Sequence, residues 1–171
     1  DAESALEDFI HYALIANVEF ANGNALALIR DRMTDVEFYE MVISTKERHE
    51  RFDRAIGWAM FVVDLEPLAT KLEERFEAGR TSVIRNADRL KESIDLLNGS
   101  TRQRLLAKER LAEAGEYAVP HLLRTLHNSS DSRTVRNVKE MLAYIGRDAV
   151  LPLLIALPHI DDESQILVAR V

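Results

Sequence analysis

The amino-acid sequence predicts an all-α fold. Its 171 residues include only six glycines and four prolines, and apolar side chains recur at the spacing of helices. Asn98-Gly99 is the one dipeptide typical of a β-hairpin, and no alternating strand pattern follows it. A content of 47% hydrophobic and 30% charged residues is typical of a globular chain with a core. We therefore expect helices along the whole chain.

Three helices are expected in residues 1–45. The first has one apolar face, formed by Leu6, Phe9, Ile10, Ala13 and Leu14. Asn17 can cap a second helix that runs through Leu28, because its side-chain oxygen can accept from a free backbone amide. Thr34 and Glu37 have the spacing of a capping box, in which the hydroxyl and the carboxylate each bind an amide at the helix start. The buried side of this third helix is expected to consist of Phe38, Met41 and Val42.

Three more helices are expected before the repeated part of the chain. The helix over 46–61 has an apolar side that faces inward, formed by Phe52, Ile56, Ala59 and Met60. Its other side is charged and is expected to face water, with Glu47, Arg48, Arg51 and Arg54. Asp64 is a suitable cap for the next helix, which we expect to end at Gly79, because glycine commonly closes a helix. Asn86 and Gly99 bracket the last of the three in the same way.

Residues 102–126 and 133–157 repeat each other at an offset of 31 residues. Eleven of the 25 aligned positions are identical, which is far above chance. A period of about 30 to 45 residues with two helices per unit indicates a helical solenoid, in which each unit buries its apolar face on its neighbours. We expect repeats over 102–131 and 133–161, followed by a truncated third repeat.

Each repeat is expected to contain an outer helix, a turn at Gly115 or Gly146, and an inner helix. The shared apolar positions of the outer helix are Ala107, Leu111 and Ala114 in the first repeat and Val138, Leu142 and Ile145 in the second. Those of the inner helix are Val119, Leu122, Leu123 and Leu126 in the first repeat and Val150, Leu153, Leu154 and Leu157 in the second. The i, i+3, i+4, i+7 spacing of the inner helix predicts one buried stripe in both repeats.

The two repeats share one order of features: a helix, a glycine, two residues, Ala-Val, a proline at position 120 or 152, Leu-Leu and a final Leu. In this order of features they resemble HEAT repeats. Residues 1–99 are similar to the helical region that precedes the repeats in large bacterial HEAT-repeat proteins, most of them uncharacterised. The resemblance implies an N-terminal multi-helix region over 1–99 and an α-solenoid of HEAT-like helical hairpins over 100–171. Because HEAT arrays generally bind other proteins, it also implies a non-catalytic scaffold for protein–protein interaction. The chain starts with Asp1 and stops within a helical pattern, so we expect a fragment of a longer HEAT-repeat protein.

Charge and composition limit the classes of partner that are expected. The net charge is −7 and the acidic excess lies in residues 1–99, so we expect no attraction to the phosphates of nucleic acid. The longest apolar run, 56–63, is much shorter than the roughly 18 residues that a membrane-spanning helix needs. The chain has no cysteine, which excludes disulfides and thiol catalysis and fits either a cytoplasmic or an exported protein.

Catalytic motifs are scarce in the sequence. It has no G-x-S-x-G turn and no glycine loop that would bind phosphate. Metal-ligand residue types occur at His49-Glu50 with Asp53 and in the run PHIDDE at 158–163. A charged surface helix explains the first group, and a helix cap explains the second. HEAT-like hydroxylases hold iron with several His-Glu pairs, whereas this chain has one pair, outside its repeats. We therefore predict no catalytic residue, metal or cofactor. The alternatives are a metal-dependent hydroxylase, a prosthetic-group lyase chaperone or a purely structural cap for a solenoid.

The positions at which the two inner helices differ are the candidate partner contacts. His121 and Arg124 in the first repeat are polar, so this surface is not the basic groove of a HEAT-like DNA glycosylase. Leu151 and Ile155 in the second repeat add apolar surface to the segment 151–157 beyond the stripe. That segment is either covered by the N-terminal helices or by downstream repeats, or open to a partner. Burial is favoured because a helix that is apolar on all sides is usually buried. We predict His121, Arg124, Leu151 and Ile155 as partner-binding residues.

Overall fold

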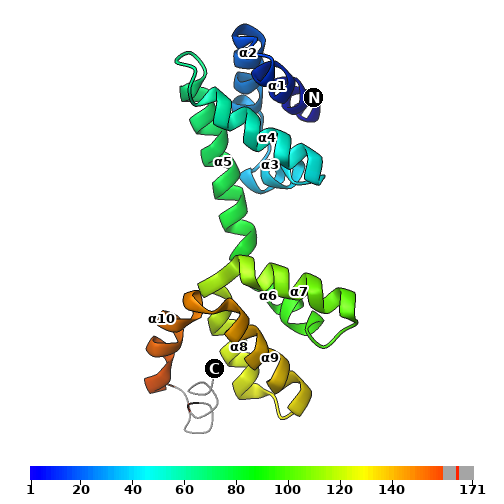
Figure 1. The fold of residues 1–171 in the computed structure, drawn as a ribbon, viewed down its shortest axis with the longest axis vertical. Coiled ribbons are helices and arrows are strands. Elements are labelled where there is room, and N and C mark those ends of the chain that lie inside the picture. Colours follow the sequence, from blue (N-terminus) through cyan, green and yellow to red (C-terminus); the bar gives the residue numbers. More distant parts are fainter. Residues whose placement is uncertain (160–164, 166–171) are drawn as a thin grey trace. The chain divides into compact units, whose positions relative to one another are not determined.

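A computed structural model of the chain describes residues 1–159 and Gln165 (Figure 1). The described residues form helices and contain no strand, so the predicted all-α class is confirmed. The helices are α1 (Ala2–Leu14), α2 (Val18–Arg30), α3 (Asp35–Val42), α4 (Lys46–Ala59), α5 (Glu66–Ile84), α6 (Ala87–Leu96), α7 (Thr101–Ala114), α8 (Val119–Asn128), α9 (Ser132–Ile145) and α10 (Arg147–Ala156). Two short 3-10 helices, η1 (Gly115–Ala118) and η2 (Leu157–His159), precede α8 and follow α10. The chain divides into two compact units, Asp1–Ser82 and Val83–Val171.

In the first unit, α1 packs on α2 and on α4. The buried face of α1 is the predicted one, with Leu6, Phe9, Ile10 and Ala13, whereas Leu14 at its end is exposed. Phe52 of α4 is the centre of an aromatic cluster, because its ring lies 6.0 Å from the ring of Phe38 in α3 and 5.4 Å from that of Phe76 in α5. These three side chains connect α3, α4 and α5 in one core.

Side-chain caps set the starts of several helices, as the sequence predicts. Asn17 accepts a hydrogen bond from the Phe20 amide, and Asn86 caps α6. Thr34 and Glu37 form the predicted capping box: the Glu37 amide donates to Thr34 Oγ1 at 3.2 Å, and the Thr34 amide donates to Glu37 Oε2 at 2.7 Å. The hydrogen bonds that the Thr34 amide and then the Thr34 hydroxyl donate to Glu37 Oε2 hold the pKa of the Glu37 carboxyl below its usual value. Local sequence therefore determines these starts.

The predicted end of α5 at Gly79 is wrong, since the helix continues to Ile84. Gly79 is needed for close packing, because a Cβ atom at this position would collide with the backbone carbonyl of Asp35. The prediction that Arg48 faces water is also wrong. Its side chain is only 16% exposed, and its guanidinium donates to Glu7 Oε1 and Glu3 Oε1, each at 2.7 Å. A second face of α4 thus contacts α1, which the period of the apolar residues alone does not indicate.

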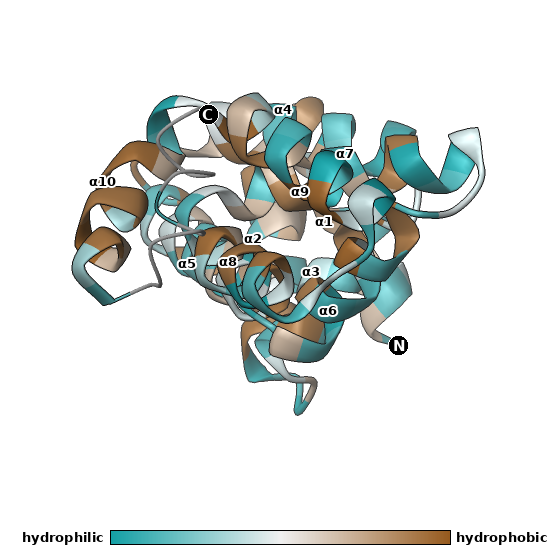
Figure 2. Cartoon of the chain, turned by 90° about the horizontal axis from the view of Figure 1, so that it is seen from below, coloured by the Kyte–Doolittle hydropathy of each residue, from teal (hydrophilic) through white to brown (hydrophobic). Residues whose placement is uncertain are grey.

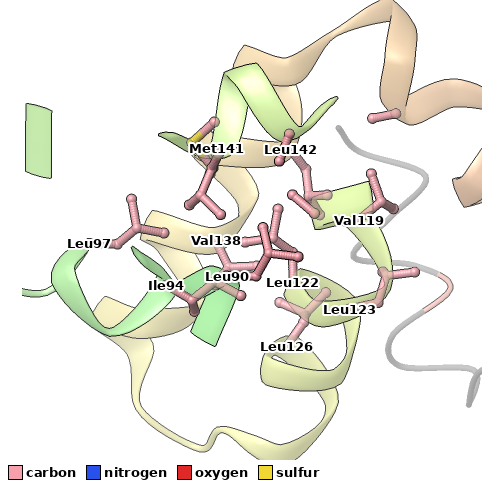
Figure 3. Packing of buried hydrophobic residues seen from close by; sticks show 14 of the residues in the cluster. Leu90, Ile94, Leu97, Val119, Leu122, Leu123, Leu126, Val138, Met141 and Leu142 are labelled. Atoms are coloured by element: carbon pink, nitrogen blue, oxygen red, sulfur yellow. The ribbon is translucent and has the colours of Figure 1, made fainter. Parts of the chain in front are cut away.

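The second unit has its own apolar core (Figure 3). Helix α7 packs on α6 and α9, and α8 packs on α6, α9 and α10. The labelled core side chains are Leu90, Ile94, Leu97, Val119, Leu122, Leu123, Leu126, Val138, Met141 and Leu142. The core therefore takes side chains from α6 as well as from both repeats, although α6 precedes the expected repeat boundary at residue 99.

Each sequence repeat forms a pair of helices with a glycine between them, as predicted. Gly115 and Gly146 have φ angles of 52° and 65°, a backbone conformation that glycine adopts at little cost. The chain turns through 119° between residues 132–145 and 147–159. The two pairs differ in that η1 precedes α8, whereas α10 begins directly at Arg147.

The predicted buried stripe is correct for α8 and wrong for α10. Val119, Leu122, Leu123 and Leu126 are all buried. In α10, however, Val150 and Leu154 are 52% and 58% exposed, and Ala149 is the buried residue. Leu153, Ala156 and Leu157 are half-buried against the core. Two of the four stripe positions of the second repeat thus have no described segment over them.

Candidate partner-binding surface

Helix α10 presents an exposed apolar face. The helix reads RDAVLPLLIA, so every residue after Asp148 is apolar, and it is hydrophobic along most of its length in Figure 2. The large side chains that remain exposed on it are Val150, Leu151, Leu154 and Ile155. Within the described residues these side chains are therefore uncovered, and the favoured expectation that other helices or further repeats bury the segment 151–157 stays a prediction. An exposed face of this kind on one helix is typical of a contact surface.

A groove of about 450 Å³ lies between α8 and α10. Its wall on the α8 side consists of Val119, Pro120 and Leu123, together with Glu116 and Tyr117 of η1. Its wall on the other side consists of Leu151, Pro152, Ile155 and Ala156, with His159 of η2. Only three lining residues, Glu116, Tyr117 and His159, are polar, so an apolar segment that enters the groove would remove few polar groups from water.

Tyr117 is held at the edge of the groove by Arg85. The Arg85 guanidinium donates a hydrogen bond to the Tyr117 hydroxyl and lies 4.2 Å from the centre of the Tyr117 ring. A cation above an aromatic face is attracted by the electrons of the ring. This contact fixes the orientation of an aromatic side chain that a bound segment would meet.

The structure separates the four predicted contact residues into two sites. Leu151 and Ile155, which are 62% and 63% exposed, lie in the apolar groove. His121 and Arg124 line a different hollow, between α6 and α8. The reason is helical geometry: on α8, Pro120 and Leu123 face α10, so His121 and Arg124 point away from that groove.

The second hollow has a volume of about 610 Å³ and is polar. Its charged residues are Asp88, Lys91, Asp95 and Arg124. Burial, and then the positive charge of Arg124, lower the pKa of His121 below its ordinary value of 6.5. His121 is therefore neutral at pH 7, and the carboxylates and cations of the hollow oppose each other. This balance gives the hollow no strong preference for an anion or a cation.

Groove residues that the sequence patterns do not single out include Glu116, Tyr117, Pro120 and His159. Tyr117 lies in η1, where the helical period is interrupted, and His159 lies beyond the end of α10. Pro120 was interpreted only as part of the repeat pattern. Its position one turn before Leu123 on α8 is the signal that could have placed it on the same face.

The metal-ligand residue types of the sequence are dispersed in the structure. His49 Nε2 lies 3.6 Å from Asp53 Oδ2, and both side chains are exposed on α4. Within residues 1–159 and Gln165, no group of three or more histidine, aspartate or glutamate side chains is arranged to hold a metal ion. Of the run 158–163, the part from 160 onward, including Asp161 and Asp162, lies outside the described residues.

Comparison of the chain with protein-family models, curated proteins and solved structures finds no match. The resemblance to HEAT repeats thus rests on the residues of the two repeats and stays a prediction. Among the described helices, none is by itself long and apolar enough to cross a membrane.

Proposed function

We propose that the chain is a non-catalytic protein-binding scaffold of HEAT-like repeats, and that it binds a partner protein in the groove between α8 and α10. The observation that carries the proposal is the exposure of Leu151 and Ile155 in a groove lined mainly by apolar side chains. Burial of one such side chain contributes about 1.5–3 kcal/mol before the costs of association. Two adjacent ones can serve as the anchor of an interface.

The groove also has features that favour binding with a small loss of entropy. Pro120 and Pro152 have fixed φ angles, and the contact with Arg85 restrains Tyr117. A surface that is ordered before binding loses little conformational freedom when a partner arrives. The groove is thus suited to recognition of an apolar segment, and the Glu116 carboxylate in its lining would orient that segment.

Site-specific photocrosslinking in cells tests this proposal. A photoreactive amino acid at position 155 should give a discrete crosslink to another protein. Leu105 on α7 provides the matched control position, because it is 60% exposed but lies outside the groove. Crosslinks that are no stronger at position 155 than at position 105 would contradict the proposal.

A pair of substitutions identifies the groove as the binding site. Leu151→Asp should abolish the crosslink from position 155, because it places a charge in the apolar wall. Leu105→Asp introduces the same charge on α7 and should leave the crosslink unchanged. Both leucines are exposed, so neither substitution should alter the circular dichroism of the folded chain.

A further inference from the structure

A third hollow, with a volume of about 310 Å³, is lined by the outer helices α7 and α9 and by Leu97, which follows α6. On the α7 side its lining includes two cations, Arg104 and Lys108. On the α9 side its lining consists of Asn137 and Glu140. The two residues of each pair lie about one turn apart on one face of their helix. The hollow therefore has a cationic wall on α7 and a wall of a different chemistry on α9.

Asn137 brings an acceptor without a partner to this hollow. Its side chain is only 9% exposed, and its amide nitrogen donates to the carbonyl of Leu97 at 3.0 Å and to Asn98 Oδ1 at 2.8 Å. The Leu97 carbonyl can only accept, so the nitrogen faces it and Oδ1 of Asn137 points away from it. Among the described residues, none donates a hydrogen bond to this Oδ1. The two donor bonds hold α9 on α6, whereas a nearly buried oxygen is unfavourable until a donor reaches it.

The charged side chains of the hollow are also available for a ligand. Within the part of the chain that the structure describes, Arg104, Lys108 and Glu140 form no ion pair with each other or with another side chain. Lys108 Nζ lies 5.8 Å from the centre of the Tyr144 ring, one turn after Glu140 on α9. This cation–π contact directs Lys108 toward the α9 wall. Opposite charges thus line one hollow without contact, which leaves space for a ligand between them.

The arrangement of these groups restricts the class of ligand. An anion attracted by Arg104 and Lys108 would be repelled by Glu140, and it would leave Asn137 Oδ1 without a donor. A cation attracted by Glu140 would be repelled by the two cations of α7. A molecule that has an ammonium and a carboxylate on one carbon atom satisfies both walls. The volume lies near the lower end of the range of ligand pockets, roughly 300–1,000 Å³, so the ligand is small.

We propose that the hollow between α7 and α9 binds a free α-amino acid with an aliphatic side chain. The carboxylate of the amino acid lies between the two cations of α7. Its ammonium donates to Asn137 Oδ1 and to the carboxylate of Glu140. Its side chain packs on Leu97 and Leu105, which supply the apolar lining. The site is separate from the protein-binding groove, because the two hollows share no lining residue.

An NMR titration of the isotope-labelled full chain with L-leucine tests the proposal. We expect shifts of the α7 and α9 amides around the hollow and a Kd of about 1 mM or lower. Two analogues of leucine are titrated in the same way: isocaproate lacks the ammonium, and isoamylamine lacks the carboxylate. Each leaves one wall of the hollow without its partner, so each should bind at least roughly tenfold more weakly than leucine.

Four variants of the chain locate the contacts. Lys108→Met keeps the apolar stem of the side chain but removes its charge, and Glu140→Gln removes the charge of the opposite wall. Each should weaken leucine binding roughly fivefold or more. Lys139→Met and Glu109→Gln are the matched controls, because these residues occupy the aligned positions of the other repeat and do not line the hollow. Both controls should leave the Kd for leucine unchanged.

Three results would overturn the inference. Binding of isocaproate as tight as that of leucine would make the hollow an anion site, and equally tight binding of isoamylamine would make it a cation site. No shift of the hollow's amides with leucine would mean that Asn137 Oδ1 binds only water. None of these results bears on the scaffold function, which crosslinking from position 155 in the other groove tests independently.

Discussion

The side-chain amide of Asn137 in α9 donates a hydrogen bond of 2.8 Å to the side-chain oxygen of Asn98, which follows α6. Asn137 also donates to the carbonyl of Leu97 at 3.0 Å. Asn98 in turn donates to Thr134 Oγ1 at 2.9 Å. Asn137 is buried, so this network fixes the position of the second repeat relative to α6 through directed bonds in addition to apolar packing.

Replacement of Asn137 should therefore destabilise the second unit. Asn137→Leu leaves the Leu97 carbonyl and Asn98 without their donor, and we expect a loss of about 1–3 kcal/mol in the free energy of unfolding. Denaturant titration followed by circular dichroism measures it. Asn128→Leu, at an exposed position of α8, is the control and should change little. Equal effects of both substitutions would mean that the network contributes nothing.

Gly79→Ala should destabilise the first unit although it replaces a glycine inside a helix. The added methyl group would collide with the Asp35 carbonyl, and overpacking of this kind costs about 1–3 kcal/mol. Gly57→Ala in α4 is the matched control. No atom lies within 4 Å of its added Cβ, so we expect a stabilisation of about 0.5–1 kcal/mol from helix propensity. Changes of the same sign in the two variants would contradict the close packing.

Arg75→Lys should lower stability even though the charge is kept. The Arg75 guanidinium donates to Asp35 Oδ1 at 2.9 Å and to the carbonyls of Leu28 and Met33 at 2.7 and 2.6 Å. A lysine cannot reproduce this fork of donors, so we expect a loss of about 1–3 kcal/mol. Thermal unfolding of Arg75→Lys is to be compared with that of Arg32→Lys, where the exposed side chain should tolerate the change. A similar melting temperature for both variants would argue against the fork.

The repeat register predicts unequal effects at equivalent leucines. Leu123→Ala should cost about 2–5 kcal/mol, because it leaves a cavity in the core of the second unit. Leu154→Ala at the aligned position should change the free energy of unfolding by less than about 0.5 kcal/mol, because the side chain is exposed. Both values come from the same denaturant titration. A loss at Leu154 comparable to that at Leu123 would show that another segment covers α10 in the free chain.

Asp131, the N-cap residue of α9, should make the free energy of unfolding depend on pH. Hydrogen bonds from the side chain and then from the backbone of Thr134 hold the pKa of Asp131 below its ordinary value of 3.8. The ionised carboxylate therefore contributes fully above pH 3.8, and the contribution is lost as the pH falls through the lower pKa of the folded chain. Asp131→Asn keeps a good cap but does not titrate, so it should lose less stability between neutral pH and acid. The unfolding midpoints of both proteins are to be measured at neutral and at acidic pH. The same pH dependence in both proteins would refute the contribution of the Asp131 carboxylate.

Only part of the candidate site could be predicted from the sequence. Leu151 and Ile155 were identified because they add apolar surface to an already apolar helix. His121 and Arg124 were grouped with them because they occupy variable inner-helix positions, but the structure places those two in a separate polar hollow. Which hollow a side chain of α8 lines depends on whether it faces α6 or α10, and these two helices are distant from each other in sequence.

The sequence by itself determined the helices, the caps at Asn17, Thr34 and Asn86, and the turns at Gly115 and Gly146. These features depend on interactions within about one helical turn, so neighbouring residues are sufficient to specify them. Only the tertiary structure decided that Gly79 permits close packing and that Leu123 is buried while Leu154 is exposed. The two leucines have the same local sequence pattern, and their burial differs because other helices pack over α8 and no described segment covers α10 at Leu154.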